Sequence, residues 1–73
     1  MYLEFPTATH TNTELLWARY TVGKFCQQHA YGYSEQYGTA NEYQVLFDCE
    51  QAYTMFTLMW DPAVLGIDFI LVP

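Results

Sequence analysis

One stretch of the chain shows a change of hydrophobic period most clearly. Residues 43–47 carry β-favouring side chains with a period of two, which predicts a strand. Asp48 then stands at a helix N-cap position, with Gln51 at the spacing of a capping box. The helix ends at Asp61-Pro62, because the residue before a proline avoids helical geometry. The residues expected on its inner face are Cys49, Ala52, Tyr53, Phe56, Met59 and Trp60.

A second strand and helix come earlier in the chain. Residues 2–5 alternate and predict a short strand. Thr11 and Glu14 have the Thr-x-x-Glu spacing of a capping box, so a helix is expected to begin there. We expect this helix to run to about His29 and to stop near Gly32. The residues on its apolar face are Leu15, Ala18, Val22, Phe25, Cys26 and His29.

The segment between these two pairs is polar. Residues 31–42 contain the turn-like sequence Gly38–Asn41. We interpret the segment as a polar edge strand that leads through this turn into the strand at Tyr43, with a flexible loop as the alternative. The last strand is expected over Ile67–Val72, which is apolar except for Asp68.

The predicted order is strand, helix, strand, strand, helix, strand. This order indicates one α+β domain over residues 1–73, a small ferredoxin-like βαββαβ sandwich. Two helices would cover one face of a four-stranded sheet, with the first and third strands in its centre. The last strand would then lie at an edge. Because an apolar edge favours pairing with another chain, it points to a homodimer.

Composition adds a surplus of aromatic side chains. The chain has 73 residues, of which 52% are hydrophobic and 19% aromatic. A domain of this size buries only about 60% of its unfolded surface. We therefore expect some aromatic side chains to face a partner.

The charge of the chain excludes several classes of partner. The net charge is −6, with Arg19 and Lys24 as the only strong cations. Direct nucleic-acid binding needs Lys and Arg to neutralise phosphates, and an anionic membrane surface attracts them as well, so neither partner is expected. An acidic surface favours a protein partner with a basic patch. The absence of a basic and apolar leader at the N-terminus predicts a cytoplasmic protein.

Few residues could carry chemistry. Cys26 and His29 are three apart on one helix, and together with Cys49 and either His10 or Asp48 they offer a zinc set. Structural zinc sites usually have two such pairs, and here there is one. A disulfide between Cys26 and Cys49 is the second interpretation, and two buried free thiols are the third, which we favour. No Gly-rich helix start or nucleophile elbow is present to form an oxyanion hole. We expect no enzyme activity, metal or cofactor.

The aromatic side chains are better candidates for function. Two of them fall on the outward side of the first helix, and the other candidates are expected on the open face of the sheet. A helix phase shifted by one position would instead return Trp17 to the core. Single-stranded RNA binding on the sheet is rejected, because residues 43–47 lack basic and glycine positions. The candidate protein-binding residues are Trp17, Tyr20, Tyr2, Tyr33, Glu4 and Asp68.

One segment resembles known sequences. The strand-Asp-helix pattern from Phe47-Asp48 through Phe56 and Leu58–Trp60 is similar to a pattern in very short, uncharacterised proteins of tailed bacteriophages. The resemblance covers about a quarter of the chain. It implies a phage accessory protein made inside the bacterium, and it transfers no catalytic residues.

Two functions follow from these observations. The first is a small acidic protein-binding module, such as an inhibitor that covers a basic site on a host or phage protein. The second is a self-assembling structural protein, joined through Ile67–Val72 or through the Trp17 surface. A Cys/His metal-binding protein is a third, minor hypothesis.

Overall fold

Every strand and helix expected from the sequence is present, and one short helix is added. The structure is a computed structural model that describes residues 1–73. In chain order the elements are β1 (Tyr2–Phe5), α1 (Asn12–His29), β2 (Tyr33–Tyr37), β3 (Tyr43–Phe47), α2 (Glu50–Met59), α3 (Pro62–Leu65) and β4 (Ile70–Val72). None of the helices is long and apolar enough to cross a membrane.

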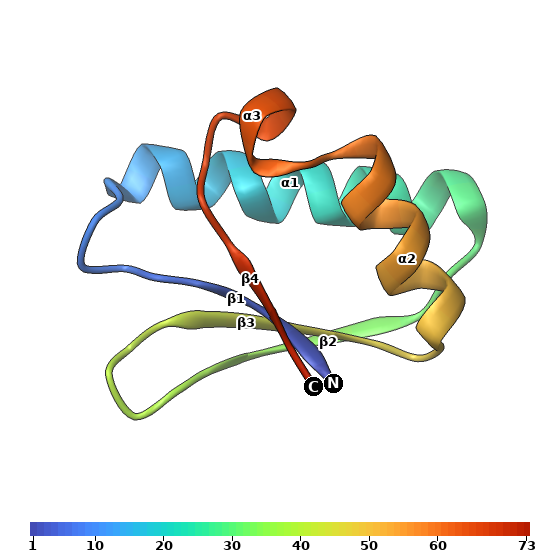
Figure 1. Ribbon diagram of the computed structural model, residues 1–73, viewed down its shortest axis with the longest axis horizontal. Helices are drawn as coiled ribbons and strands as arrows, with labels where there is room; N and C mark the ends of the chain where they lie inside the picture. The colour runs from blue at the N-terminus through green and yellow to red at the C-terminus, as the bar shows by residue number, and fades with distance from the viewer.

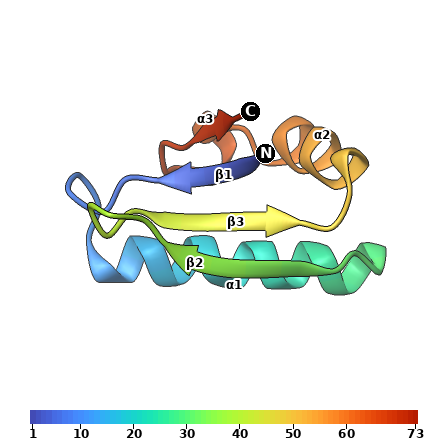
Figure 2. The ribbon, with the colours of Figure 1, turned by 90° about the horizontal axis from the view of Figure 1, so that it is seen from below.

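The strands form one antiparallel sheet in the order β2-β3-β1-β4. The first and third strands are central, as predicted. Leu3 lies opposite Val45 on β3 and opposite Leu71 on β4, so β1 is paired along both edges. The helices all lie on one side of the sheet (Figure 1), and β1, β3 and β2 run side by side in Figure 2.

The first helix begins as its sequence predicts. The Thr11 hydroxyl accepts from the backbone N–H of Glu14, and the Glu14 carboxylate accepts from the backbone N–H of Thr11. The capping box is therefore confirmed. The helix ends at Ala30, which adopts the left-handed conformation with φ 58°, two residues before the expected glycine. The Tyr31 N–H then bonds to the Cys26 carbonyl, the arrangement of a left-handed C-cap.

The polar segment forms a strand and not a loop. β2 pairs with β3 over its whole length, from Tyr33 opposite Phe47 to Tyr37 opposite Tyr43. The connecting turn is closed by backbone hydrogen bonds between Gly38 and Glu42 and between Asn41 and Gly38.

The predicted cap of the second helix is wrong. The N-cap of α2 is Cys49, and no side chain bonds to the first turn. Asp48 instead continues from β3, with its N–H donating to the Gly32 carbonyl. Its carboxylate lies against Gly32, where an added Cβ would come within 2.0 Å of Oδ2. Asp48 therefore makes a tertiary contact with Gly32 and does not cap the helix.

The chain after α2 also departs from the prediction. Asp61 follows the end of α2 and is the N-cap residue of α3. Its Oδ1 accepts a hydrogen bond from the Val64 N–H at 2.9 Å. Pro62 occupies the first turn of α3, and Gly66 ends it with a left-handed φ of 79°. The last strand consequently begins at Ile70 and not at residue 67.

The hydrophobic core lies between the sheet and the helices. Ala52, Tyr53 and Phe56 of α2 face it as predicted, whereas Cys49 and Met59 are exposed and Trp60 is half-buried. The fourteen buried apolar residues are Leu3, Phe5, Ala18, Val22, Phe25, Cys26, Tyr43, Val45, Phe47, Ala52, Tyr53, Phe56, Leu65 and Ile67.

Candidate functional site

Three aromatic rings gather where α1 approaches the α2–α3 connection. Trp17 and Tyr20 of α1 stack with ring centroids 6.0 Å apart, as expected for residues three apart on a helix. Trp60 meets Trp17 edge-on at 6.3 Å. Trp17 is 44% exposed and Tyr20 57% exposed, so the stacked pair faces solvent. We call these three residues the aromatic cluster.

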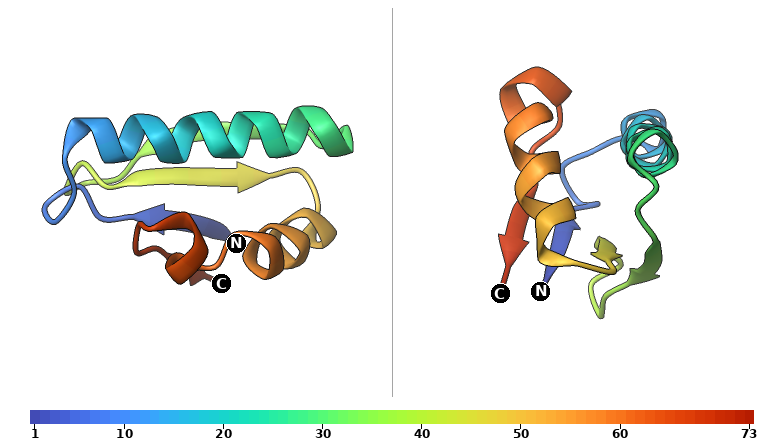
Figure 3. Two further views of the ribbon diagram at one scale, coloured as in Figure 1. Left: turned by 90° about the horizontal axis from the view of Figure 1, so that it is seen from above. Right: turned by 90° about the vertical axis from the view of Figure 1, so that its right-hand side faces the viewer.

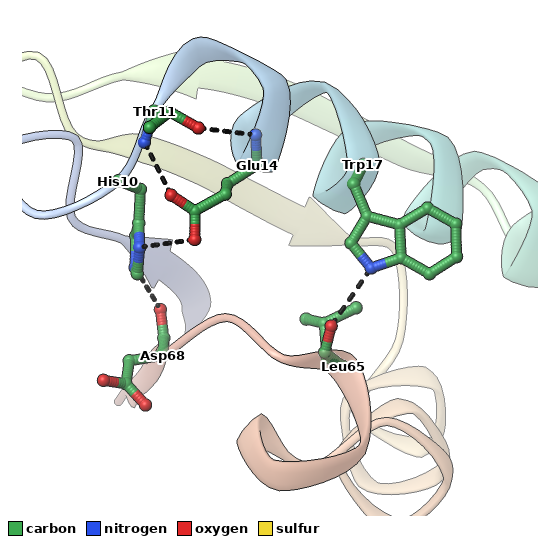
Figure 4. A network of polar contacts seen from close by, with 6 residues as sticks. All are labelled: His10, Thr11, Glu14, Trp17, Leu65 and Asp68. Atoms are coloured by element: carbon green, nitrogen blue, oxygen red, sulfur yellow. Dashed lines mark hydrogen bonds and ion pairs between the residues drawn. The ribbon is translucent and has the colours of Figure 1, made fainter.

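The Trp17 ring is fixed in position by the protein. Its Nε1–H donates to the Leu65 carbonyl at 3.1 Å, as Figure 4 shows. Trp17 thus joins α1 to the end of α3 while presenting part of its ring to solvent. Trp17 is therefore neither fully packed nor free of contacts within the protein, so the structure lies between the two alternatives left open by the sequence.

A second polar contact joins the segment before α1 to the connection between α3 and β4. His10 Nε2 donates to the Asp68 carbonyl at 3.2 Å, and His10 Nδ1 lies 3.8 Å from Glu14 Oε2 (Figure 4). The backbone and side-chain hydrogen bonds from Thr11 lower the pKa of Glu14, with a smaller contribution from His10. Glu14 therefore carries its negative charge at neutral pH, one turn before Trp17.

A small hollow opens beside the aromatic cluster. It has a volume of about 130 Å³, and Phe25 of the core forms part of its wall. Aromatic rings, an ammonium group and amide or hydroxyl groups therefore surround the same space. The complete lining is Trp17, Tyr20, Thr21, Lys24, Phe25, Gln28 and Trp60.

The six predicted contact residues do not form one surface. Tyr33 was expected on the open sheet face, but it lies opposite the core residue Phe47 and packs under α1, with its hydroxyl 3.4 Å from the Cβ position of Gly23. That expectation was wrong. Asp68 precedes β4 and lies in the connection, where its carboxylate points away from His10 (Figure 4).

The open sheet face carries the other two predicted residues. Tyr2 and Glu4 alternate with buried Leu3 and therefore point away from the helices. Glu4 belongs to a row of polar side chains across three strands: Gln36 donates to Gln44 at 2.7 Å, and Gln44 donates to Glu4 at 3.2 Å. Gln36, Gln44 and Glu4 therefore use hydrogen-bonding groups on one another, and these bonds hold their side chains in place on the open face.

The sequence did not predict a larger groove on the other flank of α1. It has a volume of about 560 Å³ between α1 and the β2–β3 turn. Arg19 borders it and pairs through Nε with Glu35 at 3.2 Å. Glu35 also accepts from the buried Tyr43 phenol. The sequence signal that could have predicted this groove is Leu16, an apolar side chain on the polar side of α1 that is exposed in the structure. The lining is Thr7, Asn12, Leu15, Leu16, Arg19, Tyr37 and Asn41.

The two cysteines lie in different environments and are not bonded to each other. Both are free thiols, Cys26 buried and Cys49 exposed, so neither the disulfide nor a pair of buried thiols is present. Burial raises the pKa of Cys26 to about 11, which keeps it protonated at neutral pH. No three His, Cys, Asp or Glu side chains lie close enough together to hold a metal ion.

Comparison with protein-family models, curated proteins and solved structures finds no match to this chain. The aromatic cluster, which has two exposed rings and in which Trp17 is held by a hydrogen bond, is the feature on which we base a functional proposal.

Proposed function

We propose that this protein is a small acidic protein-binding module whose contact residues are Trp17 and Tyr20. The observation that carries the proposal is that Trp17 is exposed and fixed at the same time, through its bond to Leu65. Tryptophan and tyrosine dominate binding energy at protein interfaces. A ring already held in place loses little conformational entropy when a partner binds.

The charge of the protein indicates the class of partner. Arg19 and Glu35 form the only ion pair between a strong cation and a carboxylate, so the other carboxylates have no such neighbour. Glu14 and Asp61 flank the aromatic cluster in sequence and contribute to the net charge of −6. A partner with Lys or Arg around an apolar patch would be attracted by the charges and anchored by the rings.

The fold class and the biological context that we propose rest on the strand order and on the resemblance of residues 47–60 to short tailed-phage proteins. We infer a ferredoxin-like sandwich, supported by the strand order β2-β3-β1-β4, with α3 as an addition. The similarity of residues 47–60 to short tailed-phage proteins supports a phage accessory protein acting in the bacterial cytoplasm. Covering a basic functional site of a host or phage protein would make it an inhibitor.

The test compares two tyrosines of similar exposure. Tyr20 is 57% exposed within the aromatic cluster, and Tyr37 is 60% exposed at the other flank of α1. We expect wild-type protein and Tyr37→Ser to retain the same partner from bacterial lysate, while Tyr20→Ser loses at least about tenfold in affinity for the purified partner. Binding should weaken as salt rises, since screening reduces charge attraction. Equal retention by both variants, or no partner for wild type, would refute the proposal.

A further inference from the structure

The two edges of the sheet differ in chemistry. At one edge, β2 exposes Ser34, Glu35 and Gln36. At the other edge, β4 pairs only with β1 and carries no charged side chain. The backbone groups along its outer side therefore have no strand partner. A short charged or polar edge is the usual protection against pairing, and β4 has only its shortness.

Apolar side chains are exposed on both faces of β4. Ile70 lies on the open face of the sheet and is 54% exposed, and Leu71 lies on the helix side and is 43% exposed. Elsewhere, on α2, Leu58 is 78% exposed. The ring of Phe69, directly before β4, packs tilted against Phe56 of α2, with the ring centroids 5.9 Å apart. Figure 3 shows both elements on the side of the molecule away from α1.

We propose that β4 pairs antiparallel with β4 of a second copy, about a twofold axis at Leu71, and extends the two sheets into one of eight strands. A strand edge can be completed only by another strand. Antiparallel pairing of two identical strands is also self-complementary, as a twofold interface requires. Each Ile70 would then lie opposite the Val72 of the other copy.

Both copies are acidic, but the carboxylates beside the strand in sequence lie far enough apart for salt to screen their repulsion. Glu4 lies opposite Ile70 on the neighbouring strand β1, and Asp68 is the acidic residue nearest to β4 in sequence, three residues from the axis. The two Asp68 residues would therefore be about 20 Å apart along the sheet edge, at about 3.4 Å per residue. That distance exceeds the Debye length of about 8 Å at physiological salt.

The size of the contact sets its expected strength. Pairing of two three-residue strands alone buries far less than the roughly 800 Å² per partner of a stable interface. The interface must therefore extend beyond the strand backbone to exposed side chains such as Leu71 on the helix side and Ile70 on the open face. We expect a weak dimer that is populated at chain concentrations of about 10 to 100 µM.

Sedimentation of matched lysine variants tests the pairing. Leu71→Lys places two ammonium groups opposite each other at the axis, and like charges in that position are destabilising. We expect Leu71→Lys to weaken dimerisation at least about tenfold. If this variant does not fold, Ile70→Lys replaces it, because Ile70 is more exposed than Leu71, and the same loss is expected. Leu16→Lys, on an α1 residue that is 60% exposed, is the control and should dimerise like wild type. A wild-type monomer at about 100 µM, or equal dimerisation of all variants, would overturn the pairing.

Two further measurements separate this interface from the aromatic one. Dimerisation should strengthen with salt, because both copies are acidic, whereas binding of a basic partner should weaken. In a Cys49→Ser background, Leu71→Cys should oxidise to a dimer, since directly opposite residues lie about 5 Å apart. Ile70→Cys should not, since its two copies lie roughly 8 Å apart. The reverse result would refute the axis at Leu71.

Discussion

Trp17 presents different surfaces to the protein and to solvent. Its indole nitrogen bonds to Leu65 inside the molecule, while its ring stacks on Tyr20 and remains 44% exposed. A helical wheel places Trp17 on the outward side of α1, which is correct for α1 alone. The wheel does not include α3, whose last residue, Leu65, bonds to the Trp17 ring. Part of the ring is therefore covered and the rest is exposed to solvent.

Replacement of Trp17 by phenylalanine should isolate the contribution of its indole N–H to stability. Trp17→Phe keeps an aromatic ring but removes the N–H that bonds to Leu65, so we expect a loss of about 1 kcal/mol in the free energy of unfolding. Urea denaturation measures this loss. Tyr20→Phe is the control, because the Tyr20 hydroxyl makes no hydrogen bond within the protein, and it should change stability by less than about 0.5 kcal/mol. Equal effects of the two substitutions would argue against the structural role of the indole N–H.

The position of Tyr33 illustrates the limit of prediction for a single residue. The alternation in β2 shows which residues share a face, but not which face is the core. That choice depends on the register with β3, where a shift of one residue exchanges the two faces. The pairing of Tyr33 with Phe47 is a property of the folded sheet and cannot be read from the polar segment alone.

Among the elements, those defined by local signals were predicted and those defined by contacts were not. The Thr11–Glu14 box and the strand predicted over residues 43–47 need only neighbouring residues, and both are confirmed, although Gln44 is buried as well as its apolar neighbours. The prediction that Asp48 caps α2 is wrong because the Asp48 side chain lies against Gly32, which is distant in sequence. The four residues of α3 are too few to show a period, although Asp61-Pro62 is a start signal as well as a stop signal.

The unsatisfied start of α2 predicts a stabilising substitution. Cys49 occupies the N-cap with φ −145° and ψ 155° but makes no side-chain cap bond. Serine fits the same backbone and accepts a hydrogen bond from the first turn, so Cys49→Ser should raise the free energy of unfolding by about 0.5–1 kcal/mol. Thermal and urea denaturation would measure the gain.

Cys49→Ala provides the comparison for that substitution. Alanine also removes the thiol but offers no acceptor, so it should not increase stability. If Cys49→Ala stabilises the protein as much as Cys49→Ser, removal of the thiol and not capping would be the cause.

At the scale of the whole molecule, buried acidic protons set the response to alkali. Burial raises the pKa of Tyr43, and its hydrogen bond to Glu35 raises it further. Burial likewise raises the pKa of Cys26 from 9.0 to about 11. The unfolded chain therefore releases protons at a lower pH than the folded chain. Above about pH 9 the unfolded state binds fewer protons, so stability falls as pH rises.

We expect the free energy of unfolding to be nearly constant from pH 7 to about 8.5 and to decline steadily above about pH 9, as measured by urea denaturation at each pH. Tyr43→Phe removes one of the groups responsible, so its stability should decline less steeply above about pH 10. Tyr20→Phe, at an exposed phenol, is the control and should follow wild type. A wild-type profile that stays flat to pH 11 would contradict this explanation.

The strand order also sets the sequence in which the protein can assemble during translation. β2 and β3 are joined by a short turn and can pair soon after they leave the ribosome. β1 is synthesised first, but its partners, Val45 on one side and Leu71 on the other, are synthesised much later. The first strand of the sheet can therefore pair only after β3 is made, and its other edge stays open until β4 follows the two helices α2 and α3.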